Sequence, residues 1–199
     1  MKKLYAVDLM ETLVGFNKKD IVAVYQAMGK DHLFKDRKSA DFTTSSAAKI
    51  EVQTIFEQLI AKDDLEYGLL EGSQDFVDWV HEQGDTTVVY SNSTERATDI
   101  VLNNLGLVPE QYGIHIASAL VFGQKNISES YHTFLRYWQN QGLEPTLFVD
   151  DTKANVIAAS TAVKALHLNT FEKYLITNEP DLEPDLDIKV VKNLGELIG

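Results

Sequence analysis

The feature that most constrains the fold of this chain is an alternation of short apolar runs with longer amphipathic segments. Short runs rich in β-branched and aromatic residues are typical of buried strands, and a 3.6-residue apolar period is typical of helices. The alternation predicts an α/β fold, a Rossmann-like parallel sheet with helices on both faces. The expected strands are residues 4–8, 86–90, 114–117, 146–150, 165–169 and 188–191.

Four segments between these strands have the pattern of helices, at residues 73–84, 93–106, 126–142 and 152–160. We expect the first to begin after an N-cap at Ser73 and to stop at Gly84. In the third, Asn126 and Glu129 resemble a capping box.

Residues 16–68 interrupt the alternation. They read as two amphipathic helices, at 17–30 and 45–64, with a polar stretch between them and no strand. An insertion after the first strand would lie over the carboxyl ends of the sheet, where open α/β sheets bind ligands. We therefore predict a core domain of residues 1–15 and 69–199 and a small α-helical cap of residues 16–68.

Composition limits the partners. The net charge is −12 and no basic stripe compensates it, which argues against nucleic acid and anionic membranes as partners. The chain has no cysteine, so disulfides and thiolate chemistry are excluded. Its apolar runs are far shorter than the ~18 residues of a membrane span. We expect a cytoplasmic protein with a small-molecule substrate, and its oligomeric state stays open.

Polar side chains follow four of the expected strands. They are Asp8 after the first, Ser91 and Asn92 after the second, Lys125 after the third, and Asp150 and Asp151 after the fourth. In a parallel sheet these ends face one crevice. Each residue alone has an ordinary explanation: Ser, Asn and Asp favour helix N-caps, and a loop lysine is usually solvated. Asp8 is harder to explain in this way, because a carboxylate ending an apolar strand needs a partner.

Together these groups suit an anionic substrate and a divalent cation. Carboxylates such as Asp8 and Asp151 match Mg²⁺, which prefers hard oxygen ligands. Lys125 and the Ser91 hydroxyl can hold phosphoryl oxygens as charge spreads in a transition state. Asp8 can attack phosphorus and form an acyl phosphate.

The order of the motifs "VDLMETL", "VVYSNS", "FGQKN" and "LFVDDTKAN" resembles that of the haloacid dehalogenase (HAD)-like hydrolase superfamily, in its phosphatase-like branch with a small helical cap. The resemblance covers nearly the whole chain and includes "LLEGSQDFVDWVHEQG" and "DIKVVKNLGELIG". It implies that Asp8 is the nucleophile. It implies substrate binding by Ser91, Asn92 and Lys125, with Lys125 also offsetting the carboxylates. The implied Mg²⁺ ligands are Asp8, Asp151 and the backbone carbonyl of Met10. Asp150 would either bind the ion directly or contact a group that binds it.

The sequence departs from this family at Met10, where most of its phosphatases have an Asp that acts as general acid and then as general base. A thioether can do neither, and losing such help typically lowers a rate by about 10²–10⁴-fold. Glu11 is one residue too far along, and we expect it to point elsewhere. Asn155 stands where the family often has an acid.

Three functions therefore remain open. The first is a Mg²⁺-dependent phosphatase acting on a small phosphorylated metabolite. The second is a non-catalytic or weakly active relative that binds a phosphorylated ligand or a protein. The third is a haloacid dehalogenase or phosphonatase-type hydrolase, since those branches also lack the second Asp. The retained pair Asp150 and Asp151 favours a metal enzyme over a dehalogenase.

Overall fold

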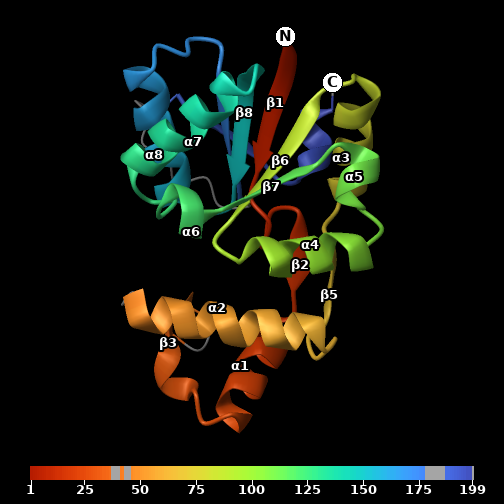
Figure 1. Cartoon of the computed structure of the whole chain (residues 1–199), viewed down its shortest axis with the longest axis vertical. Helices are drawn as coiled ribbons and strands as arrows, with labels where there is room; N and C mark the ends of the chain where they lie inside the picture. Colours follow the sequence, from red (N-terminus) through yellow and green to blue (C-terminus); the bar gives the residue numbers. More distant parts are fainter. Residues whose placement is uncertain (37–40, 43–45, 178–186, 199) are drawn as a thin grey trace.

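The computed structural model describes residues 1–36, 41–42, 46–177 and 187–198. A six-stranded sheet, in the order β10-β9-β8-β1-β6-β7, forms its centre, and all its strand pairs are parallel (Figure 1). The strands are β1 (Lys2–Val7), β6 (Thr86–Ser91), β7 (His115–Ser118), β8 (Leu143–Asp150), β9 (Glu172–Ile176) and β10 (Lys189–Val191). The predicted α/β fold with a parallel sheet is confirmed.

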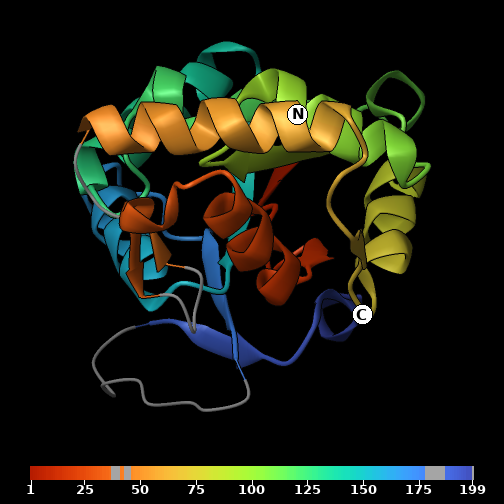
Figure 2. The ribbon, with the colours of Figure 1, turned by 90° about the horizontal axis from the view of Figure 1, so that it is seen from below.

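Helices cover both faces of the sheet (Figure 2). Those on one face are α7 (Ser128–Asn140) and α8 (Lys153–Ala165), and those on the other are α3 (Ser73–Glu82) and α4 (Glu95–Asn104). Tyr90, Phe134 and Phe148 belong to the apolar layer under α7 and α8. Short helices complete the fold: α5 (Pro109–Tyr112), α6 (Ala119–Phe122) and η2 (Leu194–Leu197).

The segment between β1 and α3 lies beyond the carboxyl ends of the sheet (Figure 1). A two-stranded ribbon, β2 (Val14–Phe16) with β5 (Tyr67–Leu69), leads into it and out again. Between these strands lie α1 (Lys18–Ala27), η1 (Asp31–Leu33), β3 (Phe34–Asp36), β4 (Asp41–Phe42) and α2 (Ser46–Ala61). Residues 37–40 and 43–45 of the predicted cap lie outside the described residues, and its status as a separate domain stays a prediction.

The expectation of no strand in residues 16–68 is wrong. The strands β3 and β4 pair antiparallel, and β5 begins inside this range. The strands β3 and β4 have only three and two residues, so they are too short to show a period-two apolar pattern.

Three local expectations in the core are also wrong. Residues 165–169 are the end of α8 and the turn after it, with His167 at φ +55°, and the strand is β9 instead. The apolar residues Leu166 and Leu168 alternate with polar ones there, which imitates a strand. At α3 the N-cap is Gly72, in the left-handed region, rather than Ser73. At α7 it is Ile127, so no capping box forms at Asn126.

Side chains of α2 bond to the loop that follows β6. The Gln53 amide donates to the Asn92 carbonyl. The Glu57 carboxylate accepts a hydrogen bond from Thr94 Oγ1 at 2.5 Å and lies 3.7 Å from Arg96 Nη1. The helix is therefore tied to the loop that carries Asn92. Among the described residues, no helix combines the length and apolar character needed to cross a membrane.

Candidate active site

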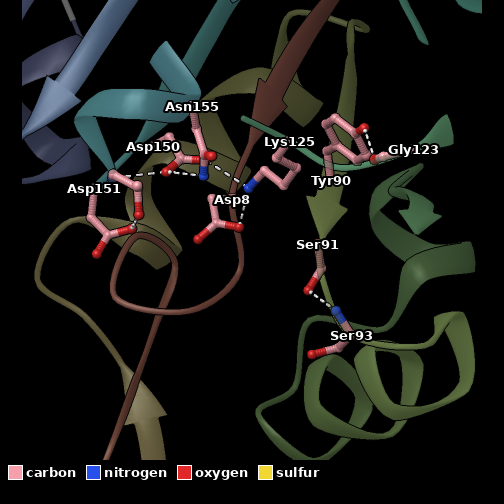
Figure 3. A network of polar contacts seen from close by, with 10 residues as sticks. Asp8, Tyr90, Ser91, Ser93, Gly123, Lys125, Asp150, Asp151 and Asn155 are labelled. Carbon is pink, nitrogen blue, oxygen red and sulfur yellow. Dashed lines mark hydrogen bonds and ion pairs between the residues drawn. The ribbon is translucent and has the colours of Figure 1, made fainter. Parts of the chain in front are cut away.

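The carboxyl ends of β1, β6 and β8 bring the predicted residues to one place (Figure 3). Asp8 follows the last residue of β1, Ser91 ends β6 and Asp150 ends β8. Lys125 reaches them from the loop between α6 and α7. Its ammonium contacts Asp8 Oδ1 and lies 2.6 Å from Asp150 Oδ2.

Lys125 is not a solvated loop lysine, because only 2% of it is exposed. Burial by itself lowers the pKa of a lysine, but Asp150 and Asp8 outweigh that effect and hold the pKa of Lys125 above its ordinary value. The site therefore contains a fixed positive charge between two carboxylates.

Asp150 is fully buried, and protein donors surround its carboxylate. Its Oδ1 accepts hydrogen bonds from the Thr152 N–H at 2.8 Å and from Asn155 Nδ2 at 3.0 Å. Its Oδ2 faces Lys125. The amide at position 155 is therefore a donor that orients Asp150, and Asp150 in turn orients Lys125.

Asp8, Asp150 and Asp151 each place a carboxylate oxygen within 4.8 Å of the others. In the described part of the chain, this is the one group of three or more acidic or histidine side chains that lie so close together. With all three carboxylates ionised, the cluster and the Lys125 ammonium together carry a net charge of −2, which a divalent cation balances. Carboxylate oxygens are the ligands that Mg²⁺ prefers, so the donor set fits this ion.

The turn after Asp8 fixes the position of Met10. The N–H groups of Leu13 and Val14 both donate to the Leu9 carbonyl, at 3.1 and 2.8 Å, and the Glu11 N–H donates to the Val14 carbonyl at 2.8 Å. None of these turn hydrogen bonds is accepted by the Met10 carbonyl oxygen, which therefore remains available as a metal ligand. The Met10 side chain is half-buried and packs against the apolar core.

The Glu11 carboxylate contacts groups near the start of α1. The backbone of this residue is in the left-handed region, at φ +60°. Its carboxylate accepts a hydrogen bond from the Phe16 N–H at 3.4 Å and lies 3.4 Å from Lys18 Nζ. These contacts hold the carboxylate toward the start of α1 and do not replace the proton donor missing at Met10.

Ser91 lies across from Lys125 on the edge of the site (Figure 3). It is buried, and its hydroxyl accepts a hydrogen bond from the Ser93 N–H at 3.0 Å. Asn92 is exposed and meets α2 through its carbonyl. The capping alternative is wrong for Ser91, Asn92 and Asp151, because the N-caps are Thr94 and Thr152.

Two serines beside Ser91 were not predicted as site residues from the sequence. Ser93 is buried, and its carbonyl accepts a hydrogen bond from Ser118 Oγ at 2.8 Å. Ser118 ends β7, one strand further along the sheet. Ser93 is the last residue of the motif "SNS", and its place next to Ser91 could have indicated it. The Ser93 hydroxyl is a further polar group at the edge where a substrate anion would bind.

Asp8 and Asp151 both resist ionisation. Burial raises the pKa of Asp8 above its ordinary value, Lys125 opposes this, and Asp150 and Asp151 add to it. Burial, and after it the neighbouring Asp150, raise the pKa of Asp151 to about 6. In the absence of a cation, the folded protein therefore holds protons that the unfolded chain releases.

This sets the sign of a stability prediction. Between the ordinary carboxyl pKa and the raised folded values, the folded state binds more protons than the unfolded state, so the free energy of unfolding falls as pH rises. In EDTA we expect Tm to fall by roughly 5 °C between about pH 5.5 and about pH 8, at ~2–4 °C per kcal/mol for a chain of this size. Mg²⁺ should reverse the trend by binding the ionised carboxylates. Asp151→Asn should reduce the slope in EDTA; a Tm that rises with pH in EDTA contradicts the assignment.

No protein-family model matches the chain, and no curated protein is significantly similar to it in sequence. Solved structures do match it along their length. CbbY from Rhodobacter sphaeroides in complex with phosphate superposes with a TM-score of 0.64 at 15% identity, over 99% of this chain and 96% of that one. A HAD-superfamily hydrolase from Ehrlichia chaffeensis gives 0.58 at 17% identity, over 100% and 96%. L-2-haloacid dehalogenase from Xanthobacter autotrophicus, with chloropropionic acid covalently bound, gives 0.60 at 14% identity, over 100% and 97%.

The chain therefore has the fold of the HAD-like hydrolases, and the resemblance stated from its motifs is confirmed at the level of the fold. These neighbours include both a protein with bound phosphate and a dehalogenase, so the fold leaves the reaction to be argued from the site.

Proposed function

We propose that this chain is a Mg²⁺-dependent phosphohydrolase that acts on a small phosphorylated metabolite, with Asp8 as its nucleophile. The observation that carries the proposal is the buried cluster in which Lys125 lies between Asp8 and Asp150 while Asp151 adds a third carboxylate. A net charge of −2 calls for a divalent cation, and cation plus lysine then attract a phosphoryl dianion. The acidic protein as a whole favours a small substrate over nucleic acid.

In the proposed reaction an Asp8 carboxylate oxygen attacks phosphorus, and the bond from phosphorus to the leaving oxygen breaks. The leaving alkoxide takes a proton from water. A second water then attacks phosphorus and gives a proton to the hydroxide left by the first water, the Asp8–phosphorus bond breaks, and inorganic phosphate leaves with the carboxylate restored. Lys125 and the Ser91 hydroxyl hold the phosphoryl oxygens throughout. Mg²⁺, held by Asp8, Asp151 and the Met10 carbonyl, would supply charge neutralisation at the phosphoryl group.

Met10 limits the range of substrates in this proposal. It offers no proton to the leaving oxygen, so esters whose leaving groups are weak bases should react fastest. The carboxylate of an acyl phosphate and the anomeric oxygen of a sugar 1-phosphate are better leaving groups than the alkoxide of a primary alkyl phosphate. The proposed enzyme is therefore slow on ordinary alkyl esters.

A panel of phosphate esters tests the proposal. We expect inorganic phosphate release with Mg²⁺, its loss in EDTA and its return when Mg²⁺ is restored. Asp151→Asn should raise the Mg²⁺ concentration needed for half-maximal rate by about 10–100-fold, by analogy with the loss of a metal-supporting group. Undiminished phosphate release in EDTA would exclude the metal-dependent mechanism.

The half-buried Met10 side chain also favours a second candidate, a relative that binds a phosphorylated ligand without turning it over. In that case a phosphate ester raises Tm while no variant releases phosphate. The third candidate, dehalogenation, has a likeness to the L-2-haloacid dehalogenase in its favour. Halide release that persists in EDTA distinguishes it from both others.

A further inference from the structure

Two aromatic rings complete the surroundings of the Lys125 ammonium. Its Nζ lies 5.5 Å from the centre of the Tyr90 ring and 5.7 Å from the centre of the Phe148 ring. Tyr90 is on β6 and Phe148 is on β8, the two strands that flank β1, and both belong to the apolar layer under α7 and α8. The ammonium is thus held between carboxylates and the faces of aromatic rings, where a cation is attracted by the ring quadrupole.

Tyr90 makes a second contact with the segment that carries Lys125. Its hydroxyl donates to the carbonyl of Gly123 at 3.1 Å, two residues before the lysine (Figure 3). Gly123 has a φ of +98°, and a side chain at this position would collide with Ser130. The path of the backbone into Lys125 is therefore specific, and the Tyr90 hydroxyl fixes one end of it.

The Tyr90 ring is itself held firmly. It is fully buried, and Phe134 stacks on it with a centroid distance of 4.4 Å and an interplanar angle of 7°. Tyr131 makes T-shaped contacts with Tyr90 and with Phe148, at centroid distances of 5.6 and 5.0 Å. Close packing of this kind leaves the ring little freedom to move.

We propose that Tyr90 is a positioning residue for Lys125: its ring supports the ammonium and its hydroxyl fixes the loop at Gly123. The need for such support arises during the reaction. Once Asp8 is phosphorylated, Lys125 exchanges the Asp8 carboxylate for the phosphoryl oxygens, and Asp150 and the two rings are the contacts that keep the ammonium in place during this exchange. The turnover part of this inference rests on the proposed function, whereas the position of the ammonium does not.

The ammonium can be observed without a substrate. Protons above an aromatic ring are shielded, so we expect the Lys125 Nζ–H signal in a ¹H–¹⁵N spectrum of the intact protein to carry a ring contribution that a variant without the ring loses. Lys125→Met assigns the signal by its disappearance. Tyr90→Leu, which removes the ring, should move the signal downfield. Tyr90→Phe, which keeps the ring, should leave most of the shielding but speed the exchange of the ammonium protons with water.

Turnover supplies the second measurement. We expect Tyr90→Leu to lower kcat by about 10–100-fold with little change in KM, since small misplacements of a catalytic group carry effects of this size. Tyr90→Phe should retain the greater part of kcat. A shifted ammonium signal in a protein without phosphatase activity supports the positioning role and removes only the proposed function.

A matched control separates position from stability. Tyr25 is also fully buried, and its hydroxyl donates to the Val52 carbonyl at 2.8 Å, within the segment of α1 and α2. Tyr25→Phe loses a comparable hydrogen bond and should leave the Lys125 signal unchanged. If Tyr90→Leu does not fold, Phe148→Leu and Tyr90→Phe carry the test. An ammonium signal that is the same in the native protein and in every folded ring variant overturns the inference.

Discussion

Asp8→Asn is expected to abolish phosphate release, with a loss of at least about 10⁴-fold in kcat, the order found when a nucleophile is removed from a catalytic unit. An amide oxygen is a poor nucleophile, while the shape of the side chain is unchanged. The substitution also removes a buried carboxylate whose pKa is raised above its ordinary value. The folded protein should therefore be at least as stable as the native one in EDTA. Initial rates with Mg²⁺ and a thermal melt in EDTA test both expectations.

The control for this variant is Asp85→Asn. Asp85 is half-buried, and it lies directly before β6, at the amino ends of the same sheet, where it accepts a hydrogen bond from the Lys3 N–H. The charge change is identical, but the site is at the opposite end of the strands. We expect kcat to stay within a factor of about two, because the substitution lies at the opposite end of the strands from Asp8. Activity that survives Asp8→Asn would show that Asp8 is not the nucleophile, and only the assignment of the fold would then stand.

The sequence was informative where a strand delivered a polar side chain to its carboxyl end. Asp8, Ser91 and Asp150 sit at the ends of β1, β6 and β8, because parallel strands align these ends at one edge. The boundaries of β6, β7 and β10 were also close to those expected, whereas the strand expected at residues 165–169 is β9 instead. Most of the site thus followed from the alternation of elements and the order of the motifs.

What the sequence did not supply was side-chain contact between distant segments. Nothing in "FGQKN" indicates that Lys125 is buried under two rings, because Tyr90 and Phe148 are far away in the chain. Likewise, the Asn155 amide binds Asp150 through a geometry that depends on how α8 begins. The strands β3 and β4 are set by pairing within the inserted segment rather than by their own pattern.

The position of Met10 decides how much of the expected chemistry can be restored by one substitution. The turn at Leu9, Glu11 and Val14 holds the backbone of Met10 independently of its side chain. A carboxyl group at position 10 would be partly buried and two residues from Asp8, and both effects raise its pKa and favour the protonated form that a general acid needs. Glu11 does not compete, because it is engaged with Phe16 and Lys18.

We therefore expect Met10→Asp to raise kcat on alkyl phosphates by about 10²–10⁴-fold, the usual contribution of general acid–base catalysis. The gain should be small on aryl phosphates, whose leaving groups need little protonation. A plot of rate against leaving-group pKa should accordingly be steep for the native protein and shallow for the variant. Met10→Asn, polar but without a proton to transfer, is the matched control and should leave the steep dependence unchanged. A folded Met10→Asp protein with no gain on any ester argues that the remaining groups bind a phosphorylated ligand without hydrolysing it.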